Sequence, residues 1–183
     1  GIYDVITCPA FYLEIINNPN KVWTPEDLLK FVYNKPGEPI TAEFPANYSN
    51  TNTLLLSMCV EKATGQKHNV LLHELILDHL GMNNTYYQGH DQIPADAAQG
   101  YFDLHGNGTI INVSNYITGS GNGYGGVYSN VFDLNKFIRA LFINKTLLSQ
   151  SSLNLMFETN REDDDFYCGV STVKKFTHKS TFG

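Results

Sequence analysis

The sequence predicts an α+β fold that is mostly helical and carries a few short strands. A wide apolar stripe with helical spacing runs from Asn50 to Thr64 and ends at Gly65, which indicates a long helix. Two segments rich in β-branched and aromatic residues, Thr109–Val113 and Phe166–Phe176, have strand character instead. Strands and helices do not alternate regularly, so a doubly wound parallel sheet is not expected.

Two further helices flank the long one. The first is expected over residues 24–33, where Thr24 caps the start, Pro25 takes the first helical position, and two acidic residues follow. A loop containing Pro36-Gly37 fills residues 34–47. The helix after the long one covers about residues 68–80 and ends before Gly81.

The second half of the chain changes character. Residues 82–118 are polar and aromatic, and a loop with five glycines follows over residues 119–126. Asn130 and Asp133 form a capping pair for a helix that continues to about Phe142, and Ser149 opens a short helix through Phe157. An acidic turn over residues 162–165 precedes the closing strand. That strand needs a neighbour, either the central β segment or a partner outside the chain.

Composition excludes several classes of protein. The chain has 183 residues with 12 basic and 18 acidic side chains, a net charge of −6, which disfavours binding to nucleic acid. No apolar run approaches the roughly 18 residues that span a membrane. The three cysteines lack the paired spacing of a zinc site or a disulfide framework. We therefore expect one domain over residues 1–183, with no metal and no cofactor.

Three motifs match a chemistry only formally. Gly121-x-Gly123-x-x-Gly126 lacks the βαβ context of a dinucleotide site, so a flexible or closely packed loop is favoured. The segment starting at His73-Glu74 has Leu77 where a zinc-protease helix needs its second histidine. Ser171-x-x-Lys174 falls in the closing strand, whereas acyl-transferring enzymes place this motif at a helix start.

Tyr48-Ser49-Asn50 stands directly before the long helix. A tyrosine in this position could act as a general base or proton shuttle, and an asparagine two residues later could bind a substrate amide. The alternative is an asparagine helix cap beside a packed tyrosine. The tripeptide alone does not decide, since Tyr128-Ser129-Asn130 repeats it.

The surroundings of Tyr48 resemble the second motif of the penicillin-recognising serine hydrolases, the branch with class C β-lactamases, DD-peptidases and related esterases. Residues 44–56, Phe-Pro-Ala-Asn-Tyr-Ser-Asn-Thr-Asn-Thr-Leu-Leu-Leu, carry the likeness, and residues 79–85 resemble the family's Leu-Gly-Met-x-x-Thr segment. Residues 125–137 are similar to its Gly-Gly-x-x-Ser-Thr-x-x-Asp-Leu helix start. Even residues 1–4 resemble the segment directly after the family's His-Thr-Ser-Gly turn.

The resemblance implies a fragment of the β-lactamase/transpeptidase-like fold, mostly its helical domain with the start of the C-terminal sheet. It implies acyl-enzyme chemistry on a β-lactam, a D-Ala-D-Ala peptide or an ester, with a small molecule or peptide as substrate. Tyr48 would be the proton shuttle, and Asn50 would orient the substrate amide and a lysine. The family's nucleophile motif would lie before residue 1 and its third motif after residue 183, so this chain alone is expected to be inactive. The family also implies a periplasmic or extracellular location.

A second hypothesis comes from another class of protein. Seven aromatic residues of the 82–128 region could form a platform for a peptide or glycan in a non-catalytic binding module: Tyr86, Tyr87, Tyr101, Phe102, Tyr116, Tyr124 and Tyr128. The position of Tyr48 is the discriminating observation. If Tyr48 faces an open cleft with Asn50 beside it, the hydrolase is favoured; if Tyr48 is buried against the helix at 54–64, a packed tyrosine beside a helix cap is favoured.

Overall fold

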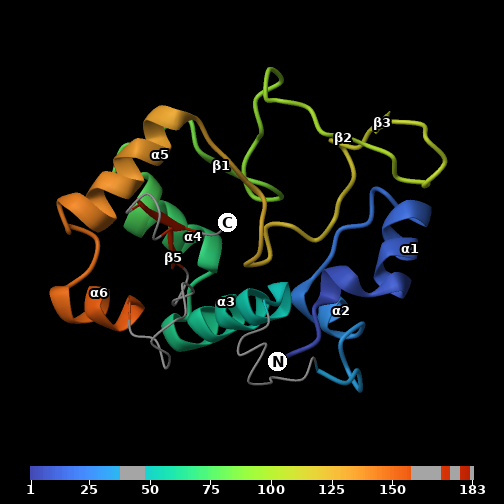
Figure 1. Ribbon diagram of the computed structural model, residues 1–183, viewed down its shortest axis with the longest axis horizontal. Helices are drawn as coiled ribbons and strands as arrows, with labels where there is room; N and C mark the ends of the chain where they lie inside the picture. Colours follow the sequence, from blue (N-terminus) through green and yellow to red (C-terminus); the bar gives the residue numbers. More distant parts are fainter. Residues whose placement is uncertain (38–47, 158–169, 174–177, 182–183) are drawn as a thin grey trace. The chain divides into compact units, whose positions relative to one another are not determined.

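Helix α3 occupies Asn50–Thr64, the bounds that its apolar spacing predicts. The computed structural model describes residues 1–37, 48–157, 170–173 and 178–181, and α3 lies between α2 and α4 along that chain (Figure 1). The Ser49 hydroxyl accepts a hydrogen bond from the Thr51 backbone N–H at 3.2 Å and so caps the helix start. Gly65, with φ of 71°, ends the helix in the left-handed conformation that glycine adopts without strain.

The chain forms two compact units, and each is described by itself. Unit 1 comprises Gly1–Leu72 and Tyr86–Tyr128, and unit 2 comprises His73–Thr85 and Ser129–Gly183. Unit 1 contains η1 (Val5–Thr7), α1 (Pro9–Asn17), α2 (Pro25–Leu29), α3, α4 (His68–Leu72), β1 (Tyr86–Tyr87), β2 (Tyr101–Phe102), β3 (Ile111–Asn112) and β4 (Val127–Tyr128). Its strands pair antiparallel as β1 with β4 and β2 with β3. Among the described residues, no helix has both the length and the apolarity to cross a membrane.

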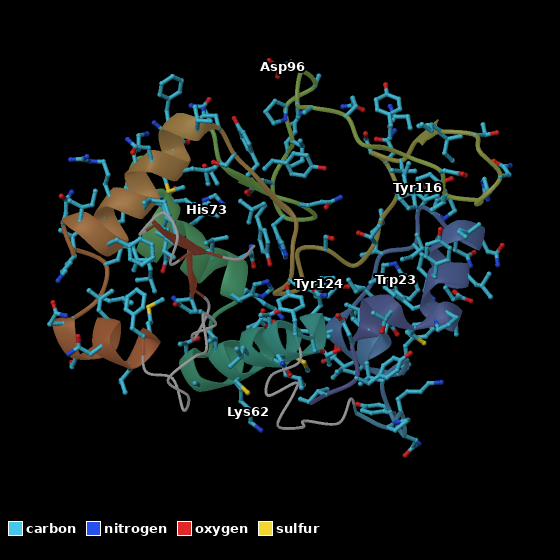
Figure 2. All side chains as sticks on the ribbon, in the orientation of Figure 1. Trp23, Lys62, His73, Asp96, Tyr116 and Tyr124 are labelled. Atoms are coloured by element: carbon cyan, nitrogen blue, oxygen red, sulfur yellow. The ribbon has the colours of Figure 1, made fainter. Side chains whose placement is uncertain are left out.

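The core of unit 1 gathers residues from its first helices, from α3 and from the glycine-rich loop. Phe11 and Trp23 meet edge to face with ring centroids 5.0 Å apart, and the Trp23 indole N–H donates to the Ile117 carbonyl at 3.0 Å. Trp23 and Tyr124, both labelled in Figure 2, belong to this buried cluster. Its members are Val5, Cys8, Phe11, Ile15, Trp23, Leu28, Leu29, Leu54 and Tyr124.

The glycine-rich loop packs closely against α3. At Gly123, φ is +95°, and a Cβ atom there would lie 2.6 Å from the Ser57 side chain and 2.7 Å from the Thr53 carbonyl oxygen. The Gly123 N–H donates to the Tyr87 hydroxyl at 3.0 Å, and the Ser57 hydroxyl donates to the Asn122 carbonyl at 3.2 Å. Of the two loop types that the sequence favoured over a nucleotide site, the structure has the closely packed one.

His68 fastens the same loop to the end of α3. Its Nδ1 lies 2.7 Å from the Glu61 carboxylate, and its Nε2 lies 3.1 Å from the Gly121 carbonyl oxygen. Burial alone would raise the pKa of Glu61, but hydrogen bonds from His68 and Lys67 lower that pKa from 4.5 to about 2. Glu61 therefore stabilises unit 1 in its ionised form.

Unit 2 is tied together by the buried carboxylate of Asp133. Its elements are η2 (His73–Leu77), α5 (Val131–Ile138), η3 (Arg139–Ile143), α6 (Gln150–Met156), β5 (Val170–Val173) and β6 (His178–Thr181). Asp133 accepts from the Asn84 N–H at 2.8 Å, the Thr85 hydroxyl at 3.2 Å and the Lys136 ammonium at 2.7 Å. Burial would raise the pKa of Asp133, but these bonds outweigh it and hold the pKa below its usual value.

The closing strand has a different neighbour from the two that the sequence suggested. Strand β5 pairs antiparallel with β6, from Val170 opposite Thr181 to Val173 opposite His178. Within the described residues, β5 therefore pairs with β6 and not with the central β segment.

The predicted helices differ from the observed ones mainly in how they start and end. The first predicted helix is shorter, as α2, and α1 precedes it unpredicted. The helix expected over 68–80 changes from α4 to the π-helical η2, and the one from Asn130 changes from α5 to η3. The loop over 38–47, the acidic turn over 162–165 and both ends of the closing strand fall outside the described residues.

Replacing Gly123 with alanine should destabilise unit 1 by about 2–4 kcal/mol, because the new Cβ meets α3 and the positive φ is strained. Gly108→Ala is the matched control, because its φ is +83° but a Cβ there has no neighbour within 4 Å. The control should cost only about 1–2 kcal/mol. Urea unfolding of both variants measures the difference, and equal losses would contradict the close packing.

Acid should remove the stabilisation that Glu61 provides. Because the pKa of Glu61 is lowered to about 2, its contribution is complete above pH 4.5 and disappears as pH falls toward 2. The free-energy difference between the wild type and Glu61→Gln should therefore shrink over that range. A pH-independent difference for Glu61→Gln would refute this account.

Candidate functional site

Tyr48 and Asn50 lie together at the start of α3, with opposite degrees of exposure. Tyr48 is 62% exposed, whereas Asn50, the first residue of the helix, is only 8% exposed. The Tyr48 hydroxyl donates to the Asn50 side-chain oxygen at 3.3 Å. The capping of α3 by Ser49 leaves Tyr48 just outside the helix, which is why a buried amide and an exposed phenol meet here.

The buried side of Asn50 faces an aspartate from the beginning of the chain. The Asn50 side-chain N–H donates to the Asp4 carboxylate at 2.9 Å, across 46 positions in the sequence. The neighbouring Thr51 hydroxyl donates to the Tyr3 carbonyl at 2.8 Å and accepts from the Val5 N–H at 3.0 Å. The sequence had singled out residues 1–4 only for their family likeness, and nothing in it assigned Asp4 to the site.

This arrangement can hold and direct a proton at the protein surface. The phenol oxygen of Tyr48 gives its hydrogen to Asn50 and keeps its lone pairs for another donor. A hydroxyl held in this way can accept a hydrogen bond from an incoming nucleophile. Within the described residues, no group of three or more His, Cys, Asp or Glu side chains could hold a metal ion.

The other motifs stand apart from this pair. Ser171 lies in strand β5, as the sequence predicts, and Lys174 lies outside the described residues. The repeated tripeptide ends at Asn130, whose side chain caps α5 by accepting from the Asp133 N–H at 2.9 Å. Asn130 is therefore a structural cap, unlike Asn50, whose side chain bonds Tyr48 and Asp4.

The aromatic residues of the 82–128 region do not form a single exposed platform. Tyr87 and Tyr124 are buried, at 4% and 6% exposure, and Tyr124 belongs to the core of unit 1. Tyr101 and Phe102 are exposed on the short hairpin of β2 and β3. Only part of the set is thus accessible to a peptide or glycan.

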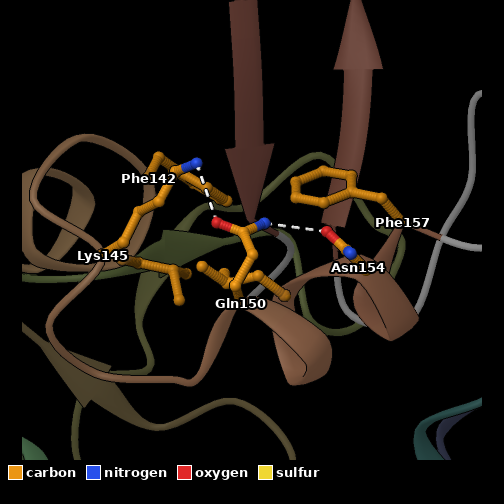
Figure 3. Close-up of a pocket in the computed structure, with 7 residues that line it drawn as sticks. Phe142, Lys145, Gln150, Asn154 and Phe157 are labelled. Carbon is orange, nitrogen blue, oxygen red and sulfur yellow. Dashed lines mark hydrogen bonds between the residues drawn. The ribbon is translucent and has the colours of Figure 1, made fainter.

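Unit 2 contains a hollow of about 140 Å³ between η3 and α6 (Figure 3). Phe142 and Phe157 line it, with ring centroids 6.0 Å apart. Its polar side chains bond one another: Lys145 donates to Gln150 at 3.1 Å, and Gln150 donates to Asn154 at 2.8 Å. These mutual bonds already use polar groups that a ligand would need, so the hollow supplies no second candidate site.

A family model described as Beta-lactamase matches residues 19–166 of the chain. The D-stereospecific amidohydrolase from Streptomyces sp. is 29% identical, with a TM-score of 0.75 over 93% of this chain and 51% of that one. The D-amino acid amidase from Ochrobactrum anthropi SV3, solved with L-phenylalanine amide, is 26% identical, with a TM-score of 0.61 over 74% of this chain and 40% of that one.

A penicillin binding protein from Bacillus halodurans shares the fold at 21% identity, with a TM-score of 0.69 over 94% of this chain and 54% of that one. The chain thus spans about half the length of these solved relatives. They confirm the β-lactamase/transpeptidase-like fold, and the family model covers well over half of the sequence. The chain belongs to the beta-lactamase family.

Proposed function

We propose that this chain provides the Tyr48–Asn50 motif of a serine hydrolase that works through an acyl-enzyme. The observation that carries the proposal is the bond between the exposed Tyr48 hydroxyl and the buried Asn50 amide, in a chain of this family. Tyr48 acts as the proton shuttle. Asn50 orients Tyr48 and the substrate amide.

Of the substrates that the resemblance allows, we propose an acyl group derived from a D-amino acid. The two relatives above 25% identity are named for D-stereospecific amide hydrolysis and for D-amino acid amides, which favours an amide over an ester. A D-Ala-D-Ala peptide carries the same type of bond, an amide whose carbonyl belongs to a D-residue. A β-lactam is a strained amide and belongs to the same class of acyl donor.

The reaction needs a serine hydroxyl as nucleophile. Tyr48 transfers a proton away from this serine during attack and toward the departing amine afterwards. As the serine oxygen bonds to the substrate carbonyl carbon, its proton moves to the Tyr48 oxygen while the hydrogen of Tyr48 passes to the neutral amine of the lysine in the Ser-x-x-Lys motif. When the C–N bond breaks, the departing amine takes that proton, and an acyl-serine ester remains. Water then attacks the ester, the serine recovers its proton, and the free acid leaves.

We also propose that the 183-residue chain does not catalyse this reaction alone. Its one Ser-x-x-Lys sequence begins at Ser171, in strand β5. The motif works at a helix start, where the lysine lies one turn after the serine, whereas Ser171 lies in a strand. Ser171 is therefore an unsuitable nucleophile.

The isolated chain should neither react with a fluorophosphonate probe at Ser171 nor hydrolyse D-phenylalanine amide. Peptide mapping by mass spectrometry and an amine-release assay measure the two. An adduct at Ser171 would identify it as the nucleophile, and turnover by the chain that is lost in Tyr48→Phe would overturn the proposed inactivity.

In a longer polypeptide that joins a Ser-x-x-Lys helix to this chain, D-phenylalanine amide should be cleaved in preference to the L-isomer. Tyr48→Phe should lower kcat by about 10²–10⁴ with little change in KM, because it removes the proton shuttle. Tyr101→Phe is the matched control, since Tyr101 is 63% exposed and Tyr48 is 62% exposed. Equal kcat values for the two variants would exclude Tyr48 from the reaction.

A further inference from the structure

The Asn50 amide has one orientation that satisfies both of its neighbours. A carboxylate only accepts hydrogen bonds, so the side of Asn50 that faces Asp4, 2.9 Å away, must be its NH₂ group. The side-chain oxygen of Asn50 then faces Tyr48 and accepts its hydroxyl hydrogen. Without Asp4, the two ends of the amide differ little in shape, and a rotation of 180° would present NH₂ to Tyr48 instead.

The direction of the Asn50 amide sets the direction of the tyrosine hydroxyl. With the Asn50 oxygen toward it, Tyr48 donates its hydrogen inward and leaves its lone pairs for a second donor. With NH₂ toward it, Tyr48 would accept from Asn50 and turn its own hydrogen outward. Only the first arrangement leaves both lone pairs of the Tyr48 oxygen free to accept a hydrogen bond from the serine hydroxyl.

The backbone around Asp4 is held on both sides. The Thr51 hydroxyl, which is fully buried, binds the carbonyl of the residue before Asp4 and the N–H of the residue after it. The second carboxylate oxygen of Asp4 accepts from the Ile6 N–H at 3.2 Å and caps the short helix η1. Asp4 is thus held in place relative to Asn50, although the two residues are far apart in sequence.

From this chain of contacts we infer that Asp4 is a positioning residue for the proposed hydrolytic site. It fixes the Asn50 amide and, through that amide, the hydroxyl of Tyr48. The inference rests on the proposed function for its catalytic meaning, but its structural content can be measured without any turnover. Asp4 acts through Asn50, and none of its contacts requires substrate.

Hydrogen exchange of the Asn50 side-chain amide tests this in the ¹⁵N-labelled 183-residue chain. Asp4→Ala should make the exchange about tenfold faster, because the bond to a charged acceptor is lost. Asp4→Asn keeps one accepting oxygen, but its NH₂ group replaces the other and faces either Asn50 or the Ile6 N–H, so its exchange should fall between those of the wild type and Asp4→Ala. Asp103→Ala is the matched control, because that carboxylate accepts the N–H groups of Asn107 and Gly108. The control should leave Asn50 unchanged.

Hydrogen exchange of the Val5 backbone amide distinguishes two roles of Asp4: orienting the Asn50 amide, or only holding the chain start against α3. The Val5 amide donates to the Thr51 hydroxyl and reports whether the segment remains docked on α3. In Asp4→Ala, faster hydrogen exchange of the Asn50 side-chain amide, together with unchanged protection of the Val5 backbone amide, supports the inference. Loss of both protections would show that Asp4 merely anchors the segment, and no change at Asn50 would show that another group orients the amide; either result overturns it.

Kinetics in the longer polypeptide provide a separate readout. Asp4→Ala should lower kcat by about 10–100-fold while KM changes less than threefold. An inactive polypeptide whose Asn50 amide still depends on Asp4 would refute the proposed function alone. An active polypeptide with an unchanged kcat in Asp4→Ala would refute the role of Asp4 alone.

Discussion

The Thr51 hydroxyl makes the contact on which the candidate site depends. It is fully buried, and its bonds to the Tyr3 carbonyl and the Val5 N–H join the first turn of α3 to the beginning of the chain. Those two backbone groups flank Asp4, so one hydroxyl fixes both the segment and the carboxylate within it. A buried hydroxyl with no partner would be costly, and the segment and the helix therefore satisfy each other.

The glycine-rich loop also holds α3, because Gly123 has no side chain and can therefore approach the helix closely. Gly123 approaches so closely that the Thr53 carbonyl and Ser57 would meet a Cβ atom, and the Ser57 hydroxyl bonds the loop at Asn122. Tyr48 and Asn50 are therefore presented by a helix that is held by the chain start through Thr51 and by the glycine-rich loop. A helix held on both sides positions its first residues more precisely than a free loop would.

Local patterns predicted α3, because its apolar spacing and Gly65 lie close together in the chain. The helix is capped by Ser49 and not by the asparagine that the sequence offered. Asp4 was missed because its partner is 46 residues away, and no spacing rule connects an isolated aspartate to a distant amide. The partner of β5 was missed for a related reason. Strand β6, with the sequence His178-Lys-Ser-Thr181, has little of the β-branched and aromatic character that marked β5, and only pairing shows it to be a strand.

The segments that carried the family resemblance divide into two physical kinds. Residues 82–85 and 129–133 meet through Asp133, which binds Asn84 and Thr85, while the hydroxyls of Thr85 and Ser129 lie 2.7 Å apart. Each of these segments completes the buried polar contacts of the other, and the contacts hold unit 2 together. Tyr48 differs, because its hydroxyl contacts the buried amide of Asn50 while the residue itself is largely exposed. A side chain whose inner contact is fixed and whose outer face is open can act on another molecule, so the chemical prediction concentrates on Tyr48.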